Sequence, residues 1–314
     1  MANDDVIKID LDGVLRERLP RLSKFIPQFA VEWMKRTIRQ DDLNRILEEN
    51  AGLEGADFCR GALKSLDINV EARYEERLPP ATHRRVLYVS NHPLGGLDGM
   101  ALIDYVQRRH GGRVHFVVND LLSAVKPLEG VFLPVNKFGK QNREAVRAVD
   151  EAFAGDDPII MFPAGLVSRF RRAPHLNAES KKKMVADLPW NKMFVNKAHH
   201  YKRDVIPLFF SGKNSMHFYR MANLRRRLGI GFNFEMIYLP GEMVDMAHST
   251  FTISFGIPIS WDRLTPGQDA AGCARSIGTY VYHINIVDAG QRPRKKTILP
   301  TPVANTTHHN RKDG

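Results

Sequence analysis

The chain of 314 residues is long enough for one or two domains with a sizeable core, since 43% of its residues are hydrophobic. Lysine and arginine (46) outnumber aspartate and glutamate (35), and the net charge of +11 favours an anionic partner: nucleic acid, an anionic bilayer or an acidic substrate. Its two cysteines, Cys59 and Cys273, lie far apart, which excludes a disulfide scaffold and fits a reducing cytosolic compartment. The acidic N-terminus precedes no apolar run, and no apolar stretch approaches ~20 residues, so we expect neither a signal peptide nor a membrane-spanning helix.

Residues 1–80 predict a helical N-terminal region. Apolar side chains recur at helical spacing within a basic segment, and Asp41 and Asp42 are typical of the start of the next helix. The apolar positions are Phe25, Ile26, Phe29, Trp33 and Ile38. Two interpretations stay open: this stripe lies at a membrane interface, or it packs on the protein's own core.

Residues 81–290 predict an α/β domain with a central, mostly parallel sheet flanked by helices, because strand-like and helix-like segments alternate. We expect strands over residues 85–90, 114–118, 158–162 and 205–210, and further β-like runs over 234–239 and 251–259. Helices are expected over residues 100–109, 142–154, 215–229 and 268–287. Residues 291–314, whose end is polar and aperiodic, predict a flexible tail.

Chemistry is first indicated directly after the strand over residues 85–90, where His92 is followed by Pro93, two glycines and Asp98. The end of a strand that opens into a helix is where α/β proteins commonly place ligands. An imidazole titrates near neutral pH and suits a general base, and a carboxylate on its other ring nitrogen would orient it. Spacing alone nevertheless favours a loop histidine and a helix N-cap aspartate.

Four segments, in this order, resemble the motifs of the glycerolipid acyltransferase superfamily, which includes lysophosphatidate acyltransferases. They are Asn91-His92-Pro93 with Asp98, the run from Gly130 to Lys137, the run from Phe162 to Arg169, and the run from Val205 to Leu208. The resemblance implies an acyltransferase in which His92 is the general base and Asp98 its orienting partner. The acceptor hydroxyl would then attack a thioester directly, without a serine or cysteine nucleophile. Five residues separate His92 from Asp98 where family members usually have four, and the Gly95-Gly96 pair suits the tighter turn that this requires.

The second and third of these segments carry the residues that the resemblance assigns to substrate binding, which are Asn136, Lys137, Arg143, Gly165, Ser168 and Arg169. Asn136 or Lys137 stands where family members often have arginine, and Arg169 keeps a guanidinium that suits a phosphate or a carboxylate. Ala164 and Leu166 replace the family's glutamate and threonine, so we expect an acceptor other than plain lysophosphatidate. The resemblance suggests a lyso amino-acid lipid, whose 3-hydroxy fatty chain receives a second acyl group.

The expected donor is an acyl thioester on acyl carrier protein or coenzyme A, used as a co-substrate, and we predict no metal and no other cofactor. The other expected partners are the lyso-lipid acceptor and an anionic membrane surface. We predict a peripheral protein on the cytoplasmic side of the inner membrane, held by the basic residues after the third segment and by an amphipathic helix over residues 215–229. That helix is equally compatible with packing on the core.

Nucleic acid is not an expected partner, because the sequence carries no zinc-finger spacing, aromatic RNA-binding signature or clear helix-turn-helix. The alternatives that stay open are a lysophosphatidate acyltransferase, a lipid-binding protein that keeps the fold without catalysis, and a hydrolase that uses water as the acceptor.

Overall fold

The computed structural model of the chain describes residues 8–18, 20, 25–119, 126–135, 143–172 and 183–288. Its strands are β1 (Asn69–Arg73), β2 (Val86–Ser90), β3 (His115–Asn119), β4 (Phe132–Val135), β5 (Ile159–Met161), β6 (Arg169–Arg171), β7 (Met184–Ala186), β8 (Asp204–Phe210) and β9 (Thr250–Phe255). Its α-helices are α1 (Leu11–Arg18), α2 (Gln28–Ile38), α3 (Gln40–Glu49), α4 (Gly55–Ser65), α5 (Gly96–His110), α6 (Arg143–Ala154), α7 (Met193–His200), α8 (Met216–Arg227), α9 (Leu239–Asp245) and α10 (Ala270–Asp288). A 3-10 helix, η5 (Phe234–Tyr238), directly precedes α9.

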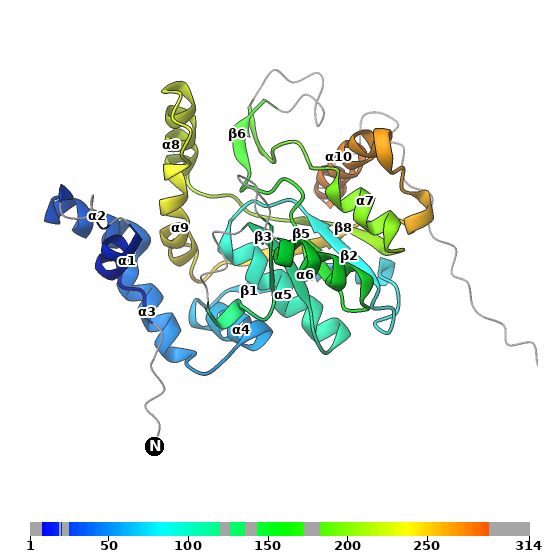
Figure 1. Cartoon of the computed structure of the whole chain (residues 1–314), viewed down its shortest axis with the longest axis horizontal. Coiled ribbons are helices and arrows are strands. Elements are labelled where there is room, and N and C mark those ends of the chain that lie inside the picture. The colour runs from blue at the N-terminus through cyan, green and yellow to red at the C-terminus, as the bar shows by residue number, and fades with distance from the viewer. Residues whose placement is uncertain are drawn as a thin grey trace, which may run out of the picture.

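Seven of the described strands form one sheet in the order β1-β9-β8-β2-β5-β3-β4 (Figure 1). The five strands from β8 to β4 are parallel, and β9 pairs with β8 in the antiparallel sense. Strands β6 and β7 form a separate antiparallel pair. The predicted α/β fold with a mostly parallel sheet is therefore confirmed, whereas the predicted tail at 291–314 lies outside the described residues.

Helices cover both faces of the sheet because its central strands are apolar along their whole length. In β2 all five residues are buried. Val86 and Tyr88 join the apolar cluster that α4 and α5 form on one face, while Leu87 and Val89 join the cluster that α6, α7 and α10 form on the other. Burial on both faces is typical of parallel sheets. The parallel pairing of β2 with β5 and β8 brings the carboxyl ends of these three strands to one edge of the sheet.

The β-like run predicted over residues 234–239 is wrong, because these residues form η5 and the first residue of α9. Pro240 lies in the first turn of α9, where a helix needs no N–H donor, whereas a central strand would need that donor. Met236, Tyr238 and Leu239 pack against a small apolar cluster, so their spacing reflects burial in a helical segment.

One strand of the sheet lies where the sequence predicts a helical region. β1 falls within residues 1–80 and pairs in parallel with β9, from Asn69 opposite Thr250 to Arg73 opposite Ser254. Its residues alternate between exposed and half-buried, as expected for a strand at the edge of a sheet. The charged residues Glu71 and Arg73 weaken the apolar signal by which a strand is recognised.

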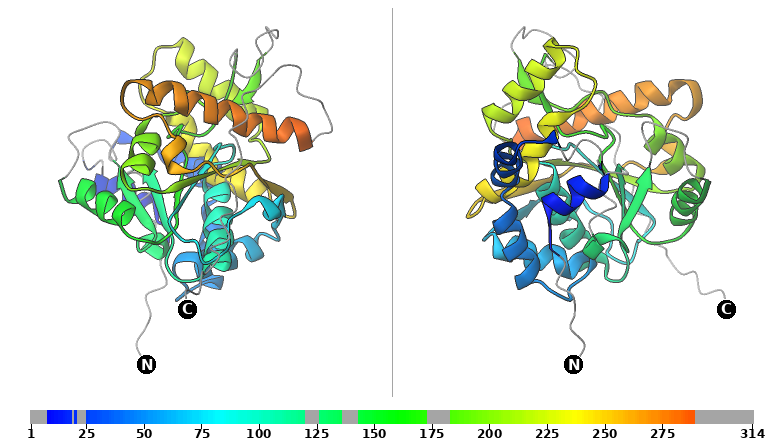
Figure 2. Two further views of the ribbon diagram at one scale, coloured as in Figure 1. Left: turned by 90° about the vertical axis from the view of Figure 1, so that its right-hand side faces the viewer. Right: turned by 60° about the vertical axis from the view of Figure 1, so that its left-hand side comes forward.

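The N-terminal helices pack on the segment that contains η5 and α9, and Figures 1 and 2 show α2 beside this segment. The rings of Trp33 and Tyr238 meet edge to face, with 6.2 Å between their centroids. Arg39 Nη2 lies 2.5 Å from Asp245 Oδ1. The two backbones approach closely, because a Cβ atom on Gly241 would lie 2.3 Å from a carbonyl oxygen of α2.

The apolar stripe predicted in the N-terminal region is divided between the interior and the surface. Ile38 is buried, whereas Phe25, Phe29 and Trp33 are 83%, 77% and 50% exposed. Packing on the protein's own core therefore accounts for Ile38 and not for the three aromatic rings. In the part of the chain that the structure describes, no helix is long and apolar enough to cross a membrane.

Candidate active site

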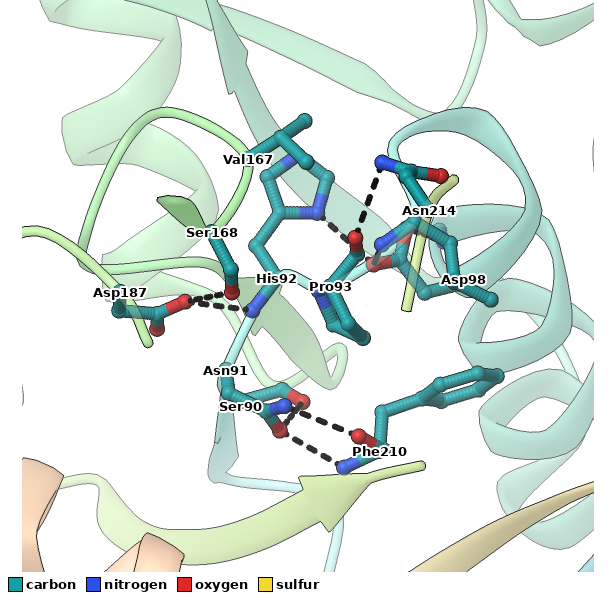
Figure 3. Close-up of polar contacts among 12 residues, drawn as sticks. Ser90, Asn91, His92, Pro93, Asp98, Val167, Ser168, Asp187, Phe210 and Asn214 are labelled. Carbon is teal, nitrogen blue, oxygen red and sulfur yellow. Dashed lines mark hydrogen bonds and ion pairs between the residues drawn. The ribbon is translucent and has the colours of Figure 1, made fainter. Parts of the chain in front are cut away.

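The loop after β2 is anchored to the end of β8 by two asparagines. Asn91 Nδ2 donates to the Phe210 carbonyl at 2.9 Å, and Asn91 Oδ1 accepts from the Phe210 N–H at 2.7 Å. Asn214, which follows β8, donates from Nδ2 to the Pro93 carbonyl at 3.1 Å. Figure 3 shows these contacts flanking His92. They place its imidazole at the carboxyl ends of two adjacent parallel strands, β2 and β8.

The predicted contact between His92 and Asp98 is present in the structure. His92 Nδ1 lies 3.0 Å from Asp98 Oδ2, and the carboxylate is fully buried in the first turn of α5. The same carboxylate accepts the Leu94 N–H at 3.0 Å and the Gly99 N–H at 2.9 Å. The aspartate thus both orders the loop and binds the imidazole. The N-cap assignment that spacing alone favoured is wrong, because the N-cap position is Gly95 and Asp98 is the third residue of α5.

His92 is held on every side except one. Its ring stacks on Phe162 with 4.0 Å between centroids. Its backbone N–H donates to Asp187 Oδ1 at 3.2 Å, and its backbone carbonyl accepts the Ser168 N–H at 2.7 Å. Within the described residues, Nε2 makes no hydrogen bond. A carboxylate on Nδ1 favours the tautomer with hydrogen on Nδ1, which leaves the Nε2 lone pair free to accept a proton.

Ser168 and Gly165, two of the predicted substrate-binding residues, use their polar groups within the protein. The Ser168 side chain is buried, and its Oγ donates to Asp187 Oδ1 at 2.5 Å. Gly165 is exposed, but its N–H donates to the Phe162 carbonyl at 2.9 Å. Ala164, which stands where the resembled family has glutamate, is buried in the apolar cluster beneath the sheet.

Arg169 belongs to a buried group of charges. Its Nη1 donates to the Val167 carbonyl at 2.7 Å, and its Nη2 lies 3.0 Å from Glu235 Oε1. Glu235 is fully buried, and its other oxygen lies 2.8 Å from Arg225 Nε. Burial lowers the pKa of Arg169, while the Glu235 carboxylate opposes that shift. Two arginines against one glutamate leave this group with a net positive charge.

The remaining predicted site residues are not brought to His92 by any contact in the described chain. Arg143 is exposed at the start of α6, and Asn136 and Lys137 lie outside the described residues. An open cavity of about 730 Å³ lies along α7, and Lys192, Lys197 and His200 are among its lining residues. None of the predicted site residues lines it.

Asp187 and Glu235 are buried carboxylates that were not among the site residues predicted from the sequence. Each is a single acidic residue within an apolar run, Asp187 after Met184-Val185-Ala186 and Glu235 between Phe234 and Met236. A carboxylate in such a run is a signal of a buried, hydrogen-bonded group, because charged side chains are rarely buried without partners.

Known proteins similar to this chain agree in reaction type. A family model described as Acyltransferase matches residues 13–287. A lyso-glycine lipid O-acyltransferase of Bacteroides thetaiotaomicron is 39% identical over 284 residues, which cover 90% of this chain and 100% of that protein. A protein of the same name from Phocaeicola vulgatus is 38% identical over 284 residues, covering 90% of this chain and 98% of its own. The crystal structure of the 1-acyl-sn-glycerophosphate acyltransferase PlsC from Thermotoga maritima aligns over 90% of this chain and 98% of its own, with 15% identity and a TM-score of 0.45.

Proposed function

Because this chain belongs to the acyltransferase family, we propose that it moves a fatty acyl group from an acyl thioester to the hydroxyl of a lyso amino-acid lipid, with lyso-glycine lipid as the first candidate. The observation that carries the reaction is the buried contact between His92 and Asp98, which leaves Nε2 free at the carboxyl edge of the sheet. The name of the two relatives supports the choice of acceptor.

In the proposed mechanism, His92 Nε2 takes the proton of the acceptor hydroxyl as its oxygen attacks the thioester carbonyl. The new C–O bond forms, the C–S bond breaks, and the imidazolium returns the proton to the departing thiolate. Asp98 stabilises the imidazolium and keeps hydrogen on Nδ1. General base catalysis of this kind contributes about 10²–10⁴-fold to a rate.

The acceptor end of the site supports a carboxylate-bearing lipid over lysophosphatidate. Ala164 and Leu166 offer no polar side chain where the resembled family has glutamate and threonine. Arg169 already donates to Val167 and Glu235. We therefore propose that it attracts the acceptor anion through the net positive charge of the group formed by Arg169, Arg225 and Glu235. Gly165 and Ser168, together with Asn136, Lys137 and Arg143, stay proposed acceptor-side residues.

We further propose that the protein binds an anionic membrane surface peripherally, on the cytoplasmic side, where acyl thioesters on carrier protein or coenzyme A are made. Two apolar surfaces support this. One carries Phe29 and Trp33 of α2 with the preceding Phe25. The other carries Leu224 and Leu228 at the C-terminal end of α8, next to three arginines. Tyr238 contacts both helices, through Trp33 of α2 and His217 at the start of α8. Aromatic rings beside arginines are typical of helices that lie in a membrane interface.

The test is acyl transfer by the purified protein, with lyso-glycine lipid and lysophosphatidate as competing acceptors and with acyl carrier protein and coenzyme A thioesters as donors. Mass spectrometry should show the diacyl glycine lipid as the main product. His92→Ala and Asp98→Asn should each lower kcat by at least about 10²-fold, since the first removes the base and the second removes the carboxylate that orients it. The matched control is His248→Ala, because His248 is 79% exposed and pairs with Asp67 away from β2.

Other outcomes would favour the alternatives. Preferred acylation of lysophosphatidate would overturn the proposed acceptor, and release of fatty acid without an acceptor lipid would indicate a hydrolase. Lipid binding without any acyl transfer would indicate a non-catalytic protein.

A further inference from the structure

Asp187 gathers donors from three separate segments around His92. Its Oδ1 accepts the His92 N–H at 3.2 Å and the Ser168 hydroxyl at 2.5 Å, and its Oδ2 accepts Trp190 Nε1 at 2.9 Å. Its own N–H donates to the Tyr282 hydroxyl of α10 at 2.8 Å. Figure 3 shows the carboxylate on the side of His92 opposite Asp98.

The carboxylate of Asp187 is buried, with 3% of the residue exposed, and no ion pair reaches it from the described residues. Burial raises the pKa of this carboxyl, and the hydrogen bonds from Ser168 and Trp190 oppose that shift. A buried carboxylate without a cation costs free energy of folding unless its hydrogen bonds are complete. Its three donors meet that condition, and two of them lie in the loop and the segment that frame His92.

We propose that Asp187 is a positioning residue for acyl transfer, one that fixes the backbone of His92 so that Nδ1 stays on Asp98 and Nε2 faces the acceptor hydroxyl. The inference rests on the proposed role of His92 as base. The Cα–Cβ direction of His92 follows from its backbone, whose N–H is held by Asp187 and whose carbonyl is held by the Ser168 N–H. Ser168 is itself tied to Asp187, so one carboxylate sets both anchors. A displacement of about 1 Å at a reacting group costs about 10²-fold in rate.

The experiment measures kcat and KM for acyl transfer to lyso-glycine lipid in variants of the full chain. Asp187→Ala should lower kcat about 10–100-fold and change KM for both substrates much less, because the base is misplaced while Arg169 keeps its contacts with Val167 and Glu235. Asp187→Asn keeps an oxygen for the His92 N–H but points an amide donor at Trp190 Nε1. Adding Trp190→Phe to Asp187→Asn removes that opposed donor and should restore part of the lost kcat.

The matched control is Asp104→Asn, which also removes a buried carboxylate. Asp104 lies in α5, is 7% exposed, and binds Arg60 and Arg108, each at 2.9 Å. It makes none of the contacts that hold His92. This variant should lower Tm and leave kcat unchanged. A fall in kcat for Asp104→Asn equal to that of Asp187→Ala would overturn the proposal, as would an unchanged kcat in Asp187→Ala.

A spectroscopic readout separates this inference from the proposed function. The ¹H NMR signal of the His92 Nδ1 proton, identified by its loss in His92→Ala, should shift or broaden in Asp187→Ala and stay in place in Asp104→Asn. If the wild-type protein acylates no lyso-lipid, the proposed function fails while this signal still reports on Asp187. A signal that does not change in Asp187→Ala overturns the positioning role.

Discussion

At the scale of single residues, the turn between His92 and Asp98 depends on a backbone conformation that suits glycine alone. Gly95 has φ +102° and ψ −105°, and a Cβ atom at this position would lie 3.2 Å from a methyl carbon of Leu239. Gly96 lies in the first turn of α5, and its added Cβ would meet only the Met243 sulfur, at an ordinary 3.7 Å. The two neighbouring glycines therefore have different physical roles.

Gly95→Ala should lower both Tm and kcat, because a side chain at positive φ is strained by about 1–3 kcal/mol and presses on Leu239. Gly96→Ala serves as the control and should stay near the wild-type values. Calorimetry and the acyl-transfer assay measure the two effects. Equal losses in both variants would contradict a specific need for glycine at position 95.

The sequence predicted His92 and Asp98 correctly as neighbours, because both fall in one short segment whose residues are typical of a known family. It did not indicate Asp187 or Glu235, since their contacts are distant in sequence. The bond from His92 to Asp187 joins residues 95 positions apart, and the bond from Arg169 to Glu235 joins residues 66 positions apart. No local spacing carries that information.

At the scale of elements, the close crossing of α2 and α9 couples the N-terminal helices to the segment above the active-site loop. Gly241 lies against the Thr37 carbonyl at the end of α2, while Leu239 of α9 lies over Gly95. The short α9 therefore contacts both the N-terminal helices and the loop that carries His92.

Gly241→Ala should weaken the packing of α2 by about 1–3 kcal/mol, because its methyl group would lie 2.3 Å from a backbone oxygen that has little freedom to move. Hydrogen exchange of α2 should become faster, with little change in β2. Gly231→Ala is the control, since nothing lies within 4 Å of its added Cβ. Unchanged protection of α2 in Gly241→Ala would show that the crossing is loose.

Helices and strands were predicted well where the spacing of apolar residues and the length of the segment indicated the same type of element, as for β2, α5 and β8. The prediction of a strand over 234–239 failed because a short, almost continuous apolar run fits either a strand or a short helical segment. The difference lay in Pro240, whose missing N–H is harmless in the first turn of a helix.

At the scale of the whole molecule, large exposed apolar side chains come from two distant parts of the chain. Phe25, Phe29 and Trp33 belong to the N-terminal region, and Leu228 and Phe232, which are 63% and 76% exposed, follow α8. The fold brings α2 and α8 together through η5, a contact that no local pattern predicts.

Replacing Phe25, Phe29 and Trp33 with serine should weaken binding to anionic phospholipid vesicles at least about 10-fold, since each buried aromatic side chain contributes about 1.5–3 kcal/mol. The loss of Phe25 and Phe29 should change Tm little because both rings are largely exposed, while the loss of Trp33 should lower it somewhat by removing the contact with Tyr238. Leu53→Ser with Val146→Ser is the control, as both residues are exposed apolar side chains elsewhere. Co-sedimentation gives the affinities, and equal binding by both sets of variants would exclude this surface as the membrane contact.

The contact between Asp187 and Tyr282 also sets an order in time. During synthesis on the ribosome, His92, Asp98, Ser168 and Asp187 all emerge before α10, so the Asp187 N–H cannot reach the Tyr282 hydroxyl until residue 282 has left the exit tunnel. A nascent chain or a proteolytic fragment that carries all four motif-like segments but lacks α10 has the dyad without its full support. Completion of α10 is therefore the step that supplies this last contact of Asp187.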